Sequence, residues 1–120
     1  MFIILNNFDM ENVKIVRKKG VNVYVVLKKD HVLCDAQLEI LNQKFGEFGY
    51  NMVEIPADGL TMKEQVSLAK ELKKDAETVV FASEVPVLEK YIKHYKIKWL
   101  VFVNDNEVVY THNHKKWELF

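Results

Sequence analysis

Residues 79–106 read VVFASEVPVLEKYIKHYKIKWLVFVNDN, and this stretch decides the fold. Two apolar runs without alternation begin and end it, as is typical of strands that are covered on both faces. The segment between them predicts a helix, because Pro86 falls in the first turn, where its missing N–H costs least, and Ser83 is a candidate N-cap. Strand, helix and strand with short connectors predict parallel pairing and a right-handed crossover.

A helix is also expected upstream, between two further strands. Leu38, Leu41 and Phe45 recur at helical spacing, and Gly46 or Gly49 supplies a helix end. A strand over residues 51–55 follows and stops at Pro56.

Another helix is marked by a capping box. Thr61 and Glu64 have the three-residue offset at which the two side chains cap each other's backbone N–H groups. The apolar positions that follow predict a buried stripe of Met62, Val66, Ala69 and Leu72.

Both ends of the chain predict antiparallel strands. Residues 1–5 form a β-type run, and residues 13–29 contain two such runs joined at Gly20, which predicts a hairpin. A break with a short helix before Gly20 would also fit. At the other end, residues 104–106 predict a polar turn, and the aromatic tail at 117–120 predicts an edge strand.

These elements predict a single α/β domain over residues 1–120. Its class is a small three-layer Rossmann-like domain with a parallel sheet core, an antiparallel N-terminal hairpin and C-terminal edge strands.

Composition restricts the function. Seventeen basic and seventeen acidic residues cancel, and Arg17 is the only arginine, so nonspecific nucleic-acid binding is not expected. The single cysteine, Cys34, excludes an intramolecular disulfide and favours a reducing, cytoplasmic location. No run approaches the ~20 apolar residues of a membrane span, and the start lacks the positive leader of a signal peptide.

Polar residues follow the expected strands at their carboxyl ends, where ligands bind in open α/β sheets. The candidate ligand-binding residues are Asn6, Asn7, Asp58, Ser83, Asn104 and Asp105. In a functional interpretation, Ser83 and the helix N-terminus bind a phosphate or carboxylate, and Asn6 and Asn104 hydrogen-bond to a base or sugar. In a purely structural one, Ser83 caps its helix and the Asn and Asp residues make turns.

Motifs for catalysis or metal binding are weak. The glycine-rich phosphate loops G-x-G-x-x-G and G-x-x-x-x-G-K-[ST] are absent. His112 and His114 share a strand face, but zinc requires a third or fourth ligand, so no metal site is predicted. Cys34 at a helix start, with His31 upstream, is a candidate nucleophile.

The outline of residues 79–106 resembles Rossmann-like ligand-binding domains, including sensory domains that bind cyclic oligonucleotides in prokaryotic immunity. The resemblance adds nucleotides to the possible ligands. Abundant Lys, Asn and Ile with few Gly suggest an AT-rich bacterial or phage genome.

Three functional hypotheses follow. The first is a binding module for a nucleotide-like or other anionic small molecule at the strand ends. The second is an interaction or inhibitor protein, accessory or phage-encoded, that acts through its edge strand and aromatic tail as a homodimer or with a protein partner. The third is a minimal hydrolase that uses Asp58, Asp105 or Cys34. The sequence does not decide between an enzyme and a binding protein, and it names no cofactor.

Overall fold

The computed structural model describes residues 3–4, 12–105, 108–113 and 116–119, with side chains for residues 12–102. The helices are α1 (Asp35–Phe45), α2 (Met62–Leu72) and α3 (Pro86–His94). The strands are β1 (Ile3–Ile4), β2 (Lys14–Arg17), β3 (Val23–Lys28), β4 (Asn51–Ile55), β5 (Thr78–Phe81), β6 (Lys98–Asp105), β7 (Val108–Asn113) and β8 (Lys116–Leu119).

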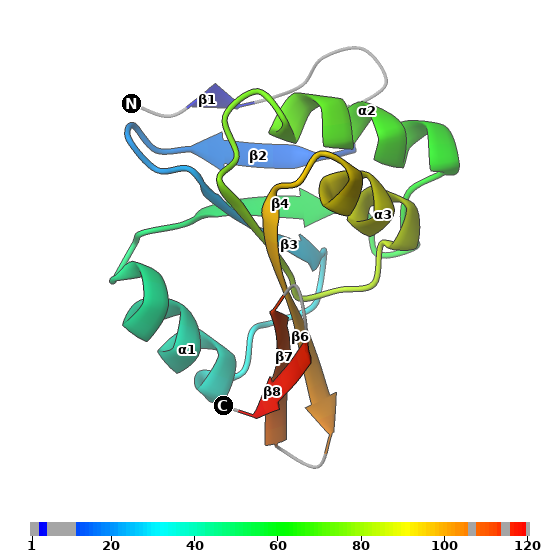
Figure 1. Cartoon of the computed structure of the whole chain (residues 1–120). Helices are drawn as coiled ribbons and strands as arrows, with labels where there is room; N and C mark the ends of the chain where they lie inside the picture. The colour runs from blue at the N-terminus through cyan, green and yellow to red at the C-terminus, as the bar shows by residue number, and fades with distance from the viewer. Residues whose placement is uncertain (1–2, 5–11, 106–107, 114–115, 120) are drawn as a thin grey trace.

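The described residues form a small α/β domain around one mixed sheet (Figure 1). The strand order is β1-β2-β4-β3-β5-β6-β7-β8. The four central strands, β4, β3, β5 and β6, are parallel; the sequence predicts this for β4, β5 and β6 but places β3 in an antiparallel hairpin. The outer strands, β1 and β2 on one side and β7 and β8 on the other, pair antiparallel with their neighbours.

The predicted N-terminal hairpin is wrong. β2 and β3 do not pair with each other, because β4 lies between them, antiparallel to β2 and parallel to β3. The buried Asn51 side chain holds the two arms apart: its Oδ1 accepts from the Lys18 N–H at 2.8 Å, and its Nδ2 donates to the Val21 carbonyl at 3.0 Å. A strand 30 residues away in sequence therefore occupies the place of the expected hairpin partner.

Helices cover both faces of the sheet (Figure 1). Val25 of β3 packs with Ile40 and Leu41 of α1, whereas its neighbours Tyr24 and Val26 face the cluster built with α2 and α3. Because successive strand residues point to opposite faces, the unbroken apolar runs of β3 and β5 are buried on both sides.

The structure confirms the sequence signals for the start of α2, the end of α1 and the start of α3. The Thr61 hydroxyl accepts from the Glu64 N–H at 3.1 Å, while the Glu64 carboxylate accepts from the Thr61 N–H at 2.9 Å. Gly46, with φ +81°, ends α1, and Pro86 begins α3. The predicted stripe of α2 is shifted, however: Gln65 and Leu68 are buried with Ala69 and Leu72, whereas Met62 is 70% exposed.

The C-terminal strands extend the sheet on the β6 side. β6 continues to Asp105, so Asn104 and Asp105 belong to the strand and not to the predicted turn, and β7 and β8 follow as antiparallel strands with β8 at the edge. The His112 side chain and all of His114 lie outside the described residues. Within the described part, no helix is long and apolar enough to cross a membrane.

Candidate functional site

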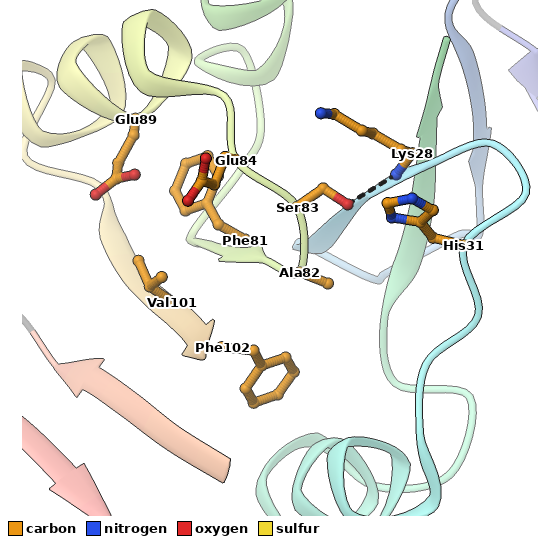
Figure 2. A pocket seen from close by; sticks show the side chains of 9 residues that line it. All are labelled: Lys28, His31, Phe81, Ala82, Ser83, Glu84, Glu89, Val101 and Phe102. Atoms are coloured by element: carbon orange, nitrogen blue, oxygen red, sulfur yellow. Dashed lines mark hydrogen bonds between the residues drawn. The ribbon is translucent and has the colours of Figure 1, made fainter. Parts of the chain in front are cut away.

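A cavity of about 440 Å³ lies at the carboxyl ends of β3, β5 and β6 (Figure 2). Pockets for small molecules are commonly about 300–1,000 Å³. Its lining residues come from these strand ends, from the loops that follow β3 and β5, and from α3: Lys28, His31, Phe81, Ala82, Ser83, Glu84, Glu89, Val101 and Phe102.

The path of the chain explains why the cavity forms here. From β3 the chain runs through α1 to β4 on one side, and then through α2 to β5 on the other side of β3. The loop after β3 leads to the face that α1 covers, whereas the loop after β5 leads to α3 on the opposite face. Loops that diverge from neighbouring parallel strands leave a crevice between them, which is where open α/β sheets bind ligands.

A tight turn shapes the β3 side of the cavity. The His31 N–H donates to the Lys28 carbonyl at 3.1 Å, and the Lys29 N–H donates to the Ile55 carbonyl at 2.7 Å. Asp30 has φ +72°, a left-handed conformation that Asp adopts more readily than most residues. The turn thereby places Lys28 and His31 on the same side of the cavity (Figure 2).

Ser83 joins the two loops. Its Oγ accepts a hydrogen bond from the Lys28 N–H at 3.1 Å, and just before it the Ala82 N–H donates to the Val26 carbonyl at 2.9 Å. The β5 loop is thus attached to the end of β3. The Ser83 hydroxyl proton has no acceptor within the described part of the chain, so it remains available to a ligand.

The prediction that Ser83 caps α3 is wrong. The N-cap is Val85, and the cap is supplied from α2, where the Gln65 Oε1 accepts from the Val87 and Leu88 N–H groups, both at 3.0 Å. Because Pro86 has no N–H, these bonds take up the donors of the first helical turn. The Val87 and Leu88 N–H groups at the N-terminus of α3 are therefore not free to bind a phosphate.

The charged groups around the cavity differ in whether they are paired. Glu89 forms an ion pair with Lys93 at 3.0 Å. Lys28, His31 and Glu84 have no side-chain hydrogen bond or ion pair with any other residue in the described ranges. Figure 2 shows the two basic side chains on the β3 side and the two acidic ones on the α3 side, across the cavity from one another. Apolar side chains, including the nearly buried Phe102, complete the wall.

The other predicted binding residues are not gathered here. Asp58 is exposed in the turn after β4, and neither Asp58 nor Cys34, the N-cap of α1, lines this cavity. The described residues contain no cluster of three or more His, Cys, Asp or Glu side chains placed to hold a metal ion.

The remaining predicted residues cannot be assigned to the cavity. Asn6 and Asn7 lie outside the described residues. The backbones of Asn104 and Asp105 belong to β6, three and four residues beyond Val101, which is the last β6 residue paired with β5. At about 3.3 Å per residue they lie roughly 10 Å or more along the strand from that point. Their side chains are also outside the described part.

Glu84 follows the same expected strand as Ser83, but Lys28 and His31 were missed as ligand-binding residues for a simple reason. With β3 interpreted as a hairpin arm, its end was not counted among the carboxyl ends of parallel strands. The signal was present, because residues 28–31 read KKDH directly after the apolar run of β3. The same rule that selected Ser83 selects Lys28 and His31 only once β3 is known to be a parallel strand.

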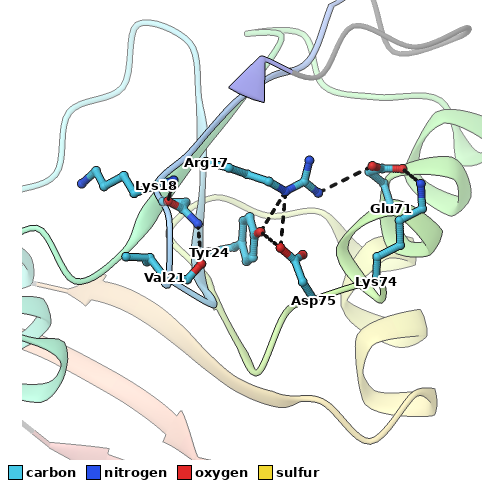
Figure 3. Close-up of polar contacts among 8 residues, drawn as sticks. Arg17, Lys18, Val21, Tyr24, Glu71, Lys74 and Asp75 are labelled. Atoms are coloured by element: carbon cyan, nitrogen blue, oxygen red, sulfur yellow. Dashed lines mark hydrogen bonds and ion pairs between the residues drawn. The ribbon is translucent and has the colours of Figure 1, made fainter. Parts of the chain in front are cut away.

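A second polar cluster lies at the opposite end of the sheet (Figure 3). The Tyr24 hydroxyl donates to the Asp75 carboxylate at 2.7 Å and accepts from the Arg17 Nε at 2.9 Å. Arg17 also approaches Glu71 and Asp75 at 3.6 Å each. Burial raises the pKa of the Tyr24 hydroxyl above its usual 10.0, and its hydrogen bond to Asp75 raises the pKa further. This cluster fastens β2 and β3 to α2.

No protein-family model, curated protein or solved structure matches this chain. The functional argument therefore depends on the geometry of the chain itself.

Proposed function

We propose that this protein is a small Rossmann-like binding module that holds a nucleotide-like or other anionic small molecule at the carboxyl ends of β3 and β5. The order β4-β3-β5-β6 supports the proposal, because numbered along the chain it is 2-1-3-4, as in flavodoxin-like sheets. In such sheets the ligand occupies the crevice beside the first strand, which corresponds to β3 here.

The cavity offers three kinds of contact. Lys28 and His31 supply hydrogen-bond donors for a phosphate or carboxylate. Glu84 supplies acceptors for hydroxyl or amino groups, and Phe102 supplies an apolar surface. A nucleotide has all three complementary parts: a phosphate, sugar hydroxyls or a base amine, and a planar ring.

The mode of phosphate binding follows from the α3 cap. Since Gln65 occupies the Val87 and Leu88 N–H groups, the anion is held by side chains rather than by that helix N-terminus. Side-chain contacts from a lysine are flexible and carry less geometric specificity than a backbone cradle. We therefore expect modest affinity for phosphate alone, with selectivity supplied by Glu84 and the apolar wall.

The observation that carries the proposal is the convergence of unpaired Lys28, His31 and Glu84 on one cavity at the reversal of the strand order. A test is thermal denaturation with adenine and guanine nucleotides, cyclic oligonucleotides and inorganic phosphate. A ligand at ten times its dissociation constant stabilises by about 1.4 kcal/mol, which for a chain of this size is a rise of about 5 °C.

Two lysine variants make the test specific to the cavity. Lys28→Met should abolish most of the shift, because it removes the ammonium group and keeps the length of the side chain. Lys29→Met is the matched control, since the adjacent Lys29 is exposed and does not line the cavity. No shift with any compound, or the same loss in both variants, would refute the proposed site.

A further inference from the structure

A second groove lies between α2 and α3, outside the cavity described above. It has a volume of about 420 Å³, and its lining residues within the described part of the chain all come from these two helices, namely Met62, Val66, Val87, Lys90, Tyr91 and His94. The two helices are joined at one end of the groove by the hydrogen bonds that the Val87 and Leu88 N–H groups donate to Gln65.

Apolar side chains form the floor of this groove. Val66, Val87 and Tyr91 are half-buried, and Met62 is 70% exposed. Met62 and Val66 are four residues apart on α2, as are Val87 and Tyr91 on α3, so each helix contributes a stripe that runs along its axis. The two stripes together leave apolar surface exposed between the helices.

The rim of the groove is basic. Lys90 and His94 line it on α3, and the exposed Lys70 follows Val66 by one turn on α2. Beyond them the Lys73 ammonium lies 4.4 Å from the centre of the Tyr95 ring. The lysine ammonium groups therefore lie at the C-terminal end of α2 and in the middle of α3.

The acidic side chains of the two helices have partners of their own, although the Glu64 carboxylate keeps its negative charge in the capping box at the first turn of α2. Glu64 accepts from the Thr61 N–H, Glu71 pairs with Arg17 and Lys74, and Glu89 pairs with Lys93. Lys70 and Lys90 form no ion pair among the described residues, so the groove combines an apolar floor with two exposed ammonium groups that a carboxylate can reach.

We infer that the α2–α3 groove binds an acidic amphipathic helix of a partner protein. Such a helix would place its apolar i, i+3, i+4 and i+7 side chains on the floor and its carboxylates beside Lys70 and Lys90. α2 has 11 residues, or about 16 Å of axis, which matches about three turns of a bound helix.

Two other occupants fit the groove less well. A second copy bound through the same groove about a two-fold axis would bring the lysine rims together, which is repulsive. A lipid bilayer presents a broad plane, whereas this apolar surface lies between two helices and only Met62 is largely exposed. A helix is narrow enough to enter the groove and contact the apolar side chains between α2 and α3, which a flat bilayer surface would contact less.

The test is a selection from displayed random peptides of about 16 residues against the full chain, followed by fluorescence anisotropy with the enriched peptides. We expect enrichment of sequences that alternate Asp or Glu with apolar residues at helical spacing. Lys90→Glu and Met62→Asp should each weaken binding at least about tenfold. Circular dichroism should show that both variants remain folded, since both side chains are exposed.

Matched controls are available on other surfaces. Phe48→Asp changes a side chain that is also 70% exposed, and Lys19→Glu reverses an exposed charge in the loop between β2 and β3. Both should leave peptide binding within about twofold of the unchanged chain.

Three results would overturn the inference. The first is selection without enrichment of acidic amphipathic peptides, and the second is equal binding of such peptides by Lys90→Glu. The third is sedimentation with phosphatidylserine vesicles that depends on Lys90 and Met62 in the absence of peptide binding, which would identify the groove as a membrane contact.

Discussion

The polar side chains at the two ends of the sheet differ in whether they are paired with other residues. At the end where the parallel strands begin, Arg17, Tyr24 and Asp75 bind one another, and the buried Asn51 bonds to two backbone groups (Figure 3). At the end where those strands finish, Lys28, His31 and Glu84 line a cavity, and their side chains form no hydrogen bond or ion pair with other described residues (Figure 2). Polar groups that are paired internally stabilise the fold, whereas unpaired groups around a cavity remain available to a ligand.

The comparison predicts that substitutions at the paired end change stability and that substitutions at the unpaired end change binding. The largest loss of unfolding free energy, about 3 kcal/mol, is expected for Asn51→Ala, because this change leaves the Lys18 N–H and the Val21 carbonyl without their hydrogen-bond partner. Urea denaturation measures the loss. Asn42→Ala, at an exposed position of α1, is the matched control and should be close to neutral; a loss below about 1 kcal/mol for Asn51→Ala would contradict the account.

The next largest effect is expected for Gln65→Ala. This change removes the acceptor for the Val87 and Leu88 N–H groups and should cost about 2 kcal/mol of unfolding free energy. Amide hydrogen exchange should also become faster in the first turn of α3. Gln43→Ala, on the exposed face of α1, controls for the loss of a glutamine; equal effects of the two variants would show that the cap of α3 contributes nothing.

Tyr24→Phe should cost about 1 kcal/mol near neutral pH, because the hydroxyl bonded to Asp75 and Arg17 is lost. Since the pKa of folded Tyr24 is raised above 10.0, the unfolded chain releases this proton first as the pH rises. The contribution of the hydroxyl is therefore complete below pH 10.0 and declines above it. Urea denaturation of the unchanged chain and of Tyr24→Phe above pH 10.0 should show that their free energies of unfolding converge. A difference that grows with pH would mean that folding lowers the pKa of Tyr24 rather than raising it.

The smallest effect on stability is expected for Lys28→Met, within about 0.5 kcal/mol, because its ammonium has no partner among the described residues. Lys29→Met should behave alike in the absence of ligand. A loss above about 1 kcal/mol for Lys28→Met alone would assign Lys28 to the paired, structural class and remove the contrast between the two ends.

The accuracy of the sequence analysis depended on whether the signal was local. The capping box of Thr61 and Glu64 was predicted correctly, and Gly46 was one of the two predicted ends of α1, because these contacts form within one helical turn. The pairing of β2 with β4 and the capping of α3 by Gln65 were not, because each joins residues more than 20 positions apart. Gln65 resembles a surface residue until the packing of α2 against α3 buries it.

The same limit applied to the site. Ser83 was selected because it directly follows an apolar run, and it does line the cavity. Lys28 and His31 required knowledge of which strand lies next to β5, and no pattern in residues 13–29 reveals that β4 separates β2 from β3. Strand order is set by packing across the whole domain.

The most direct test of the contrast is a two-dimensional amide NMR titration with the nucleotides and inorganic phosphate used for thermal denaturation. The account predicts that the amide signals of residues 28–31 and 82–84 shift saturably with at least one ligand, while those of residues 18–22 at the opposite end stay in place. Saturable shifts confined to residues 18–22, or none at residues 28–31 and 82–84 with any ligand, would contradict it.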